Sequence, residues 1–380
     1  MRFTVDRDVF SEAVSFAVKL LPQRPTQPLL SGALIEAGEN EITVSSFDYE
    51  VSARTSVTAS VEEHGRALVS GRLLNEIANR LPQAPVQVSI EDGRIAVRCG
   101  SASFSLPSMP VEEYPTVPQI DSVSGLVPAD TFAEAIAQVS VAASKDDVTP
   151  VITGVQFEVN ENALSLTATD RYRVAVRGID WENTANQPEM TALVPAKIVT
   201  EVGKTFSNNG TVQVSIIKND DRELVAFTGG NKTVTSLLIK GNYPPVRRLF
   251  PEGVDNYAVV NTADLIEATN RVGLVLEREA ALRFSFREGT VTLEAAGSET
   301  AQASETIDVH LVGDETVVSL KPQFLLDGLR ATHSEYARIS FTKTDNPNKP
   351  GPVLITSQRS QDEASDDSFK YLLQPNLLLR

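Results

Sequence analysis

Few side chains in this sequence have the type and spacing that catalysis requires. The histidines stand far apart along the chain, at His64, His310 and His333. Cys99 is the one cysteine, so a bound metal would need carboxylate ligands. Asp146 and Asp147 could form an acidic group with Asp170, but such neighbours are expected among 50 Asp and Glu residues, and we interpret them as surface charge. We find no nucleophile elbow, phosphate-cradling Gly-rich loop or His-Glu-x-x-His motif. The sequence therefore predicts no catalytic residue, no metal and no cofactor.

The composition is that of an ordinary soluble protein. Of the 380 residues, 41% are apolar and 22% are charged, and no apolar run approaches the ~18 residues that a membrane helix needs. The chain begins directly on an alternating strand pattern, which predicts no signal peptide. A single cysteine suits the reducing cytoplasm. The net charge of −16 argues against nucleic acid as a partner, unless the bases are gathered on one surface.

The elements that would position a site come in three copies. Amphipathic helices are predicted around a large apolar residue two positions before a Glu-Ala pair, over Asp6–Leu21, Pro128–Lys145 and Ala263–Arg278. A second helix follows each of them at a similar distance, over Gly71–Leu81, Ala196–Phe206 and Pro322–Ala331. The shared order and spacing indicate three repeats of one domain, which we place at 1–121, 122–252 and 253–380.

Alternating strands fill the rest of each repeat. Val86–Glu91 and Arg94–Cys99, for example, flank an Asp-Gly pair, which is a strong hairpin signal. Pro107–Pro118 contains four prolines and is predicted to be a linker on the surface. Gln361–Asp367 is acidic and polar, and is predicted to be a mobile loop. We expect packing rather than chemistry from Cys99, Tyr172 and Trp181. The predicted fold class is α+β, with two helices and an antiparallel sheet in each domain.

The charge of the second helices differs from that of the whole chain. Each carries a base near both ends and a single acid between them. The six helices together hold as many bases as acids, so the excess negative charge lies on strands and loops. Chance and solubility would account for such a pattern. A sharper interpretation is that the helices share one surface that tolerates a polyanion.

Short motifs of one known family are spread over the chain. They are Arg24-Pro25-Thr26, Phe104-Ser105-Leu106, Met109-Pro110, Tyr114-Pro115, Thr169-Asp170-Arg171-Tyr172-Arg173-Val174, Val194-Pro195, Tyr243-Pro244 and Arg247-Arg248-Leu249. By these motifs the chain resembles the bacterial sliding clamps, the β subunits of DNA polymerase III, over essentially its whole length. The resemblance implies a head-to-tail homodimer that closes a ring of six domains around double-stranded DNA. Such a ring tethers polymerases and repair enzymes to the DNA.

The size of such a ring fits a DNA duplex. Twelve helices, each about 10 Å wide, form a circle with an opening of ~28 Å. A groove depth of about 8.5 Å implies a duplex radius near 10 Å, so the duplex passes through with water to spare. Topology then supplies retention, and weak non-specific contacts suffice. The bases predicted to face DNA are Arg24, Arg72, Arg80, Lys145, Lys197, Lys204, Lys321 and Arg330.

The resemblance also implies a pocket for partners between the second and third domains. In the family, a hydrophobic pocket there takes short linear peptides from the polymerase, the clamp loader and repair proteins. Carried over by matching segments, its residues are Ile152, Thr169, Arg171, Tyr172, Arg173, Val174, Pro244, Arg248, Leu249, Leu373 and Pro375. Clamps commonly finish in Met-Pro, a small apolar residue, Arg and Leu, and this chain departs from that pattern, so Gln374 and Asn376 stay unassigned. For ring closure, the resemblance implies that Phe104 meets the helix carrying Leu274 and Val275 of the other chain.

Two hypotheses remain open at this point. The first is a DNA-encircling ring without catalysis, and the second is a non-ring acidic cytoplasmic hydrolase of three β-rich domains that uses carboxylates. The missing nucleophile and metal ligands favour the ring. The native mass would separate the two, because a ring of six domains requires a dimer. Loading driven by ATP would belong to another protein, since the sequence contains no phosphate loop.

Overall fold

The computed structural model describes residues 1–219, 222–295, 301–344, 346 and 349–378. The chain divides into two compact units. The first unit consists of Met1–Asp130, Glu182–Gln187 and Thr205–Leu238. The second consists of Thr131–Trp181, Pro188–Lys204 and Ile239–Arg380. No helix in the described part of the chain has the length and apolar character needed to span a bilayer.

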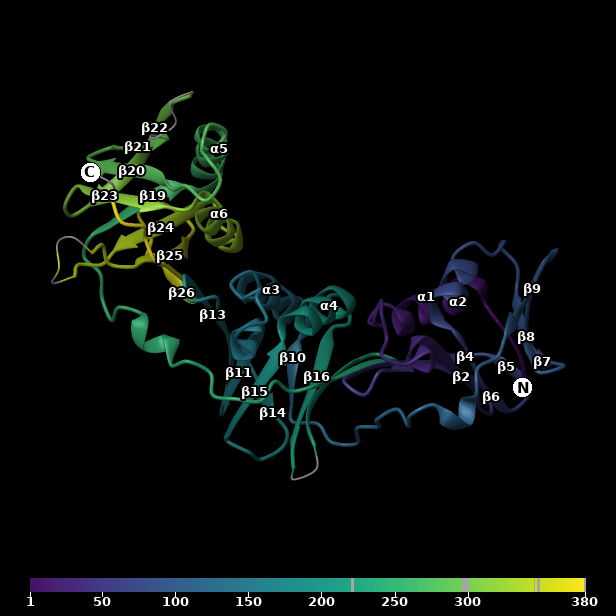
Figure 1. Ribbon diagram of the computed structural model, residues 1–380. Helices are drawn as coiled ribbons and strands as arrows, with labels where there is room; N and C mark the ends of the chain where they lie inside the picture. The colour runs from purple at the N-terminus through teal and green to yellow at the C-terminus, as the bar shows by residue number, and fades with distance from the viewer. Residues whose placement is uncertain (220–221, 296–300, 345, 347–348, 379–380) are drawn as a thin grey trace. The chain divides into compact units, whose positions relative to one another are not determined.

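Helices occur where the repeats predict them, in three pairs. Those described are α1 (Arg7–Val18), α2 (Gly71–Ala78), α3 (Ala129–Ser140), α4 (Ala196–Phe206), α5 (Thr262–Gly273) and α6 (Pro322–Ala331) (Figure 1). The first helix of each pair ends earlier than predicted, before Leu21, Lys145 and Arg278. After α3, for example, the amides of Ala142 and Ala143 bond three residues back, to Val139 and Ser140, so the last turn tightens and the helix stops.

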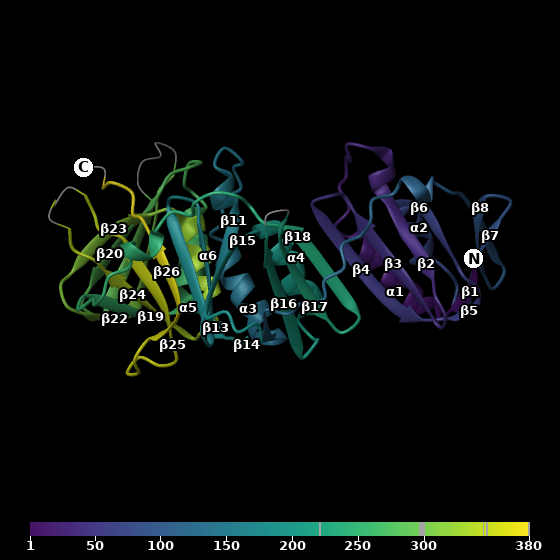
Figure 2. The same cartoon turned by 90° about the horizontal axis from the view of Figure 1, so that it is seen from below.

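The strands of the first unit form two antiparallel sheets (Figure 2). The five-stranded sheet has the order β5-β1-β7-β8-β9. It contains β1 (Arg2–Val5), β5 (Ser60–Glu63), β7 (Val86–Glu91), β8 (Arg94–Cys99) and β9 (Ala102–Pro107). The nine-stranded sheet has the order β14-β10-β16-β17-β18-β4-β3-β2-β6. It contains β2 (Gly32–Ala37), β3 (Glu41–Phe47), β4 (Val51–Thr58), β6 (Gly65–Ser70), β10 (Gly125–Pro128), β14 (Glu182–Asn183), β16 (Thr211–Lys218), β17 (Glu223–Gly229) and β18 (Lys232–Leu237).

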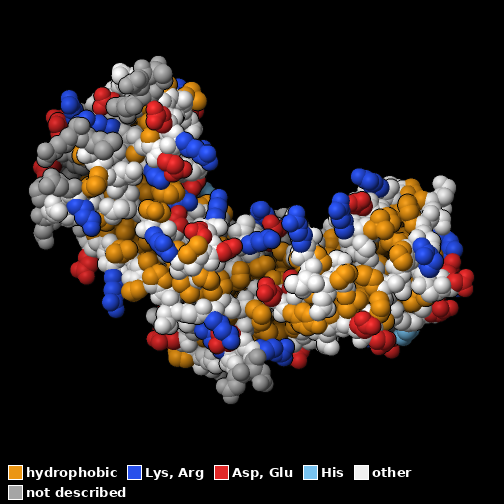
Figure 3. Space-filling view, in the orientation of Figure 1, with side chains coloured by type: hydrophobic (Ala, Val, Ile, Leu, Met, Phe, Trp, Pro, Cys, Tyr) orange, Lys and Arg blue, Asp and Glu red, His pale blue; other side chains and the backbone are white. Residues whose placement is uncertain are grey.

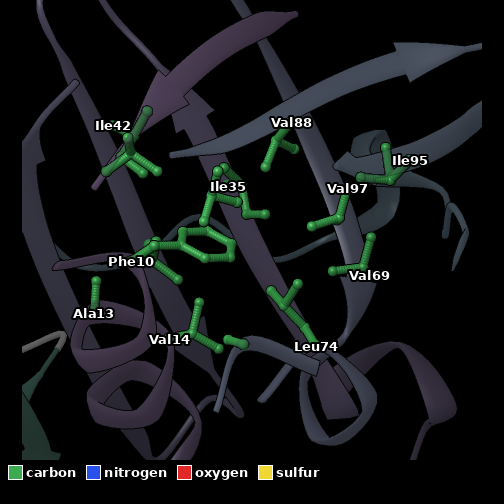
Figure 4. Packing of buried hydrophobic residues seen from close by; sticks show 14 of the residues in the cluster. Phe10, Ala13, Val14, Ile35, Ile42, Val69, Leu74, Val88, Ile95 and Val97 are labelled. Carbon is green, nitrogen blue, oxygen red and sulfur yellow. The ribbon is translucent and has the colours of Figure 1, made fainter. Parts of the chain in front are cut away.

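The core of the first repeat lies between its two helices and both sheets (Figure 4). Phe10 and Val14 from α1 and Leu74 from α2 are fully buried against Ile35 and Val88 of the strands. Asp6 caps α1 by accepting the amides of Asp8 and Val9, as a short polar residue does at a helix start. The predicted apolar stripe of the first helix is therefore confirmed as the face that packs on the sheets.

The second unit contains one antiparallel sheet of twelve strands, in the order β15-β11-β12-β13-β26-β25-β24-β19-β22-β21-β20-β23. Strands of the second repeat are β11 (Gly154–Asn160), β12 (Ala163–Thr169), β13 (Arg173–Asp180) and β15 (Glu189–Pro195). Those of the third are β19 (Tyr257–Asn261), β20 (Leu282–Arg287), β21 (Thr290–Ala295), β22 (Ala303–Val312), β23 (Thr316–Leu320), β24 (Tyr336–Phe341), β25 (Val353–Gln358) and β26 (Asp366–Leu373). The two repeats are continuous because β13 pairs with β26.

The linker segments are more ordered than predicted. Within Pro107–Pro118 lies a short 3₁₀ helix, η2 (Val111–Glu113), and Tyr114 after it is buried. The hydroxyl oxygen of Tyr114 accepts the amide of Phe47 at 2.7 Å, and burial raises the pKa of Tyr114 to about 12. The description of this segment as a mere surface linker is therefore wrong, because its tyrosine anchors it to the sheet. The other short helices are η1 (Pro28–Ser31), η3 (Pro150–Thr153) and η4 (Val246–Leu249).

The predicted loop near the end of the chain is shorter than expected. Within Gln361–Asp367, the last two residues already belong to β26, which begins at Asp366. The side chain of Asp366 accepts the amide of Ser368 at 2.8 Å and so helps to start the strand.

Candidate functional site

The turn between β12 and β13 directs neighbouring side chains to different places. Asp170 accepts the amides of Tyr172 and Arg173 at 3.0 and 3.1 Å. The hydroxyl of Thr169 donates to the carbonyl of Arg173 at 2.7 Å, which closes the turn. Arg171 has a φ of 82°, in the left-handed region that costs a residue with a Cβ about 1–2 kcal/mol. As a result Arg171 and Tyr172 are exposed, whereas Arg173 is buried.

Arg173 is held by groups from both repeats. Its Nε lies 3.0 Å from Asp170, and its Nη1 lies 2.6 Å from Asp327 of α6. Nη1 also donates to the hydroxyl of Tyr371 at 3.1 Å, and the guanidinium lies 4.5 Å from the centre of the Phe324 ring. Burial alone would lower the pKa of Arg173, but Tyr371, Asp327 and Asp170 outweigh it and raise that pKa. Arg173 therefore joins β13 to α6 by a buried ion pair.

The close approach of α6 and β26 depends on a glycine. A Cβ added at Gly328 would lie 2.6 Å from ring carbons of Tyr371. With glycine there, the Tyr371 hydroxyl reaches the carbonyl of Phe324 and donates to it at 2.7 Å. Burial raises the pKa of Tyr371, so this hydroxyl keeps its proton at neutral pH. The glycine thus positions the tyrosine that holds Arg173.

A hollow of about 590 Å³ lies beside this turn. Four of the predicted pocket residues line it together, namely Ile152, Arg171, Tyr172 and Arg173. Tyr172 is 60% exposed and stacks on Phe324, with ring centres 6.0 Å apart and an angle of 27° between the planes. Gln323, Phe324 and Asp327 of α6 also line the hollow, and sequence reasoning missed them. The expectation that Tyr172 is a packing residue is wrong.

Other predicted pocket residues lie on the opposite face of β13 and β26. Val174 forms an apolar cluster with Leu354 and Leu372, against which Val246 and Phe250 of the linker pack. In and beside η4, Pro244 is half-buried, while Arg248 and Leu249 are exposed, Leu249 by 57%. The predicted residues therefore occupy two faces that meet at the β12–β13 turn.

The end of the chain runs past the same turn. Leu373 pairs with Arg173 and is buried, and Pro375 is buried as well. The amide of Gln374 donates to the carbonyl of Tyr172 at 2.9 Å, and its side chain is exposed. The amide of Asn376 donates to Ser319 of β23 at 2.8 Å. The unassigned Gln374 thus lies beside Tyr172.

The bases predicted to face DNA differ in how free they are. Seven of the eight are exposed, namely Arg24, Arg72, Arg80, Lys145, Lys197, Lys204 and Arg330. Figure 3 shows Lys and Arg side chains along the upper side of the part drawn at the right, where Figure 1 draws α1 and α2. Lys321 differs, because it is half-buried, lies 2.9 Å from Glu279 and lies 5.9 Å from the centre of the Tyr172 ring. Lys145 lies five residues beyond α3 rather than within it.

The residues predicted to close the ring present apolar surface. Phe104 is 38% exposed on β9, which is the end strand of its sheet. Leu274 is 83% exposed, and it caps α5 rather than lying inside that helix. Val275 follows the cap and is half-buried. The helix predicted to carry both residues ends at Gly273, one residue before Leu274 and two before Val275.

Of the acids considered for chemistry, Asp146 and Asp170 both line the hollow beside the β12–β13 turn. No group of three His, Cys, Asp or Glu side chains that could hold a metal occurs among the residues that the structure describes. His333 lies 3.0 Å from Glu134, and Asp146 and Asp147 are exposed. Cys99 and Trp181 are buried, as expected of packing residues.

The chain repeats a unit of two helices packed on antiparallel sheets. One junction between repeats carries a hollow and an exposed aromatic side chain. This architecture is the DNA clamp fold of three domains. Three family models cover almost the whole chain. They describe the N-terminal, central and C-terminal domains of the DNA polymerase III beta subunit and match residues 1–118, 126–245 and 247–371. The chain belongs to this family, the beta sliding clamps.

Relatives and solved structures agree with the family models. The beta sliding clamp of Streptomyces coelicolor is 42% identical over 99% of both chains. That of Micrococcus luteus is 45% identical over 82% of this chain and all of its own. The crystal structure of the Bacillus subtilis clamp has a TM-score of 0.90 at 26% identity and covers both chains fully. A Pseudomonas aeruginosa clamp, solved bound to griselimycin, has the same fold at 23% identity and a TM-score of 0.90 over both full chains.

Membership of the family fixes the class of function. The protein is a sliding clamp, a non-catalytic processivity factor of DNA polymerase III. The hydrolase alternative finds no support in any of these similarities.

Proposed function

We propose that two copies of this chain associate head to tail in the cytoplasm and close a ring of six domains around double-stranded DNA. Within each copy we place the domains at 1–121, 122–252 and 253–380. The observation that carries the proposal is a pair of strand edges, one in each unit, along which no neighbouring strand is paired within the described residues. β9 ends its sheet and exposes Phe104. In β22, residues 303–308 pair with β21 on one side, while the pairing with β19 begins at Val309.

Free strand edges pair readily with another chain, and exposed apolar side chains beside them gain from burial. Phe104 lies on the end strand β9, and Leu274 caps α5, the helix that packs on β21 and β22. A head-to-tail contact between the first domain of one copy and the third domain of the other would cover both edges. Because each copy has one edge of each kind, two copies close the ring without leaving either exposed.

The helices of such a ring face the DNA. The exposed bases Arg24, Arg72, Arg80, Lys145, Lys197, Lys204 and Arg330 then meet phosphates, and their contacts are independent of base sequence. Lys321 contributes less, because Glu279 already neutralises it.

The β12–β13 turn is the proposed partner site. The polymerase, the clamp loader and repair proteins bind there through short linear peptides. Exposed Tyr172 and Leu249 offer apolar contacts on the two faces that meet at the turn, and exposed Arg171 and Arg248 offer hydrogen-bond donors. Aromatic and Arg residues are the types that dominate binding hot spots. The buried ion pair of Arg173 with Asp327 holds the turn in place.

The test is retention on DNA. After loading on circular DNA, the protein should stay bound in high salt and should be lost when one cut linearises the same DNA, because topology rather than charge holds it. Binding held only by charge weakens steeply with salt on both forms of DNA. Equal loss from circular and linear DNA as salt rises would contradict the ring.

A further inference from the structure

A second hollow, of about 720 Å³, opens on the same strand as Arg173 but further along it. Arg177 of β13 and Gln138 of α3 contribute to it from the second repeat. The turn after α6 and the segment from β25 to β26 contribute from the third repeat. Four residues of an extended strand span about 13 Å, so this hollow is separate from the Tyr172 turn. None of the functions described above uses it.

Two buried polar atoms of residues that line this hollow have no partner in the described part of the chain. Gln138 is 2% exposed, and its Nε2 donates to the carbonyl of Ala331 at 2.7 Å, which leaves Oε1 as an unused acceptor. The Nη1 of Arg177 donates to the hydroxyl of Ser368, but its Nε has no partner. Buried polar groups are normally hydrogen-bonded, so each unpartnered one needs an explanation. An incoming group that donates a hydrogen bond would satisfy Gln138, and a backbone carbonyl of the same incoming segment would satisfy Arg177.

The charges around the hollow indicate the sign of that group. Carboxylates line it at Glu134, Glu335, Glu363 and Asp366, and guanidinium groups at Arg177 and Arg359. One carboxylate already has a hydrogen-bond partner, since the Nδ1 of His333 lies 3.0 Å from Glu134. The pKa of Asp366 lies below its usual range, because the amide of Ser368 donates to it and the two arginines lie nearby. With Glu134 set aside, the three carboxylates of Glu335, Glu363 and Asp366 outnumber the two guanidinium groups, so a cation is favoured here.

We propose that this second hollow docks a basic segment of a partner protein, with a Lys or Arg side chain that donates to Oε1 of Gln138 and pairs with the rim carboxylates. A cationic side chain supplies both the hydrogen-bond donor that Gln138 lacks and the charge that the rim lacks. A segment, rather than a single ion, fits because the acidic groups come from α3, from the turn after α6 and from the segment leading into β26. The site is independent of the Tyr172 turn, so both can be occupied together.

The experiment uses the full-length protein and a fluorescent peptide, acetyl-Lys-Gly-Lys-Gly-Lys-amide, whose binding is followed by anisotropy in low salt. The site variant carries Glu335→Gln, Glu363→Gln and Asp366→Asn, three exposed acids of the rim. A protein of net charge −16 attracts such a peptide everywhere, so the matched control variant removes three other exposed acids, by Glu39→Gln, Glu62→Gln and Glu112→Gln.

The site variant should bind the peptide about tenfold more weakly, because it loses three charge pairs at one place, whereas the control should stay within about twofold of the parent. Gln138→Leu should weaken binding about threefold without changing the net charge. Thermal melting confirms that each variant is folded, and the three exposed substitutions provide the test if Gln138→Leu does not fold. Equal weakening in the site and control variants would overturn the proposal. Spermidine carries the same charge as the peptide but has no peptide backbone. If spermidine displaces the peptide readily, the occupant need not be a protein segment and the proposal is overturned. If spermidine displaces it only weakly, the proposal is supported.

Discussion

Arg173 offers the sharpest test of how the partner site is held together. The change is Arg173→Met, which keeps most of the side-chain volume and removes the charge. It takes away the ion pairs with Asp170 at 3.0 Å and with Asp327 at 2.6 Å, and the donor to Tyr371. The side chain of Arg173 is only 7% exposed, so water cannot replace these contacts in the folded protein.

The expected loss of stability depends on which hydrogen bonds Asp170 and Asp327 retain in the variant. Breaking a buried ion pair costs about 3–5 kcal/mol, because the remaining charge is left without a partner. Asp170 still accepts two backbone amides, and Asp327 still accepts the side-chain Nε2 of Gln323 at 2.7 Å. We therefore expect the low end, about 3 kcal/mol. That loss lowers the melting temperature of a unit of this size by about 6–12 °C.

The assay is thermal unfolding followed by circular dichroism. The matched control is Arg287→Met, which removes an exposed arginine of β20 and should shift the melting temperature by less than about 2 °C. Adding Asp327→Leu to Arg173→Met should restore at least half of the loss, since an apolar pair leaves no stranded charge on α6. A double variant as unstable as the sum of the two single variants would refute the reasoning, because the residues would then act independently.

Three further predictions concern the dimer, the peptide site and the acid limit. Charges placed at both Leu274 and Val275 should give monomers by sedimentation, because closure would bury them unpaired; a double variant that stays dimeric would move the interface elsewhere. Tyr172→Ala should weaken a hexapeptide with Leu and Phe anchors at least tenfold by calorimetry while dimer mass and retention on circular DNA persist. Arg98 holds the pKa of Glu91 at about 2, below its ordinary value of 4.5, so their mutual stabilisation is present above pH 4.5 and lost as the pH falls toward 2. The melting difference between the parent and Arg98→Gln should therefore shrink over that range, and a constant difference would assign the effect to packing.

Sequence reasoning found the repeated helices because their apolar positions recur with a period of 3.6 residues, and burial preserves that pattern. Phe10, for example, the large apolar residue two positions before the first Glu-Ala pair, is fully buried. Helix ends were predicted poorly, since bonds from residue i to i−3 stop α3 at Ser140 although apolar residues continue to Ala143. Periodicity does not carry the information on where such a tightening occurs.

The candidate site was only partly predictable for a different reason. Tyr172 and Arg173 are neighbours within the same sequence motif, yet Tyr172 is 60% exposed and Arg173 only 7%. The left-handed turn at Arg171 decides this, and the turn depends on hydrogen bonds of Thr169 and Asp170 that a linear pattern does not reveal. Phe324 was missed because it lies some 150 residues further along the chain. Its position in α6, at the start of a predicted helix, was the one available signal.

The sequence does contain a signal for the burial of Tyr114. The Tyr-Pro pair occurs at the end of both the first and the second repeat, and a surface linker gives no reason to repeat an aromatic residue. In the structure the second tyrosine, Tyr243, behaves like the first, since burial raises its pKa and its hydroxyl meets the backbone of Thr167. A repeated aromatic beside a proline therefore indicates an anchor on the sheet.

The ion pairs of the helices fit a ring that slides rather than one that grips. Arg72 lies 3.1 Å from Glu76 on the same helix, and Lys204 lies 3.5 Å from Glu201. In the proposed ring, Arg72 and Lys204 meet phosphate with their charge partly offset, and exposed pairs of this kind contribute at most about 1 kcal/mol. Such weak contacts break and re-form easily, which suits a protein that moves along DNA. A chain that bound DNA by charge alone would gain from leaving Arg72 and Lys204 unpaired, so the acids beside these two bases favour retention by closure of the proposed ring.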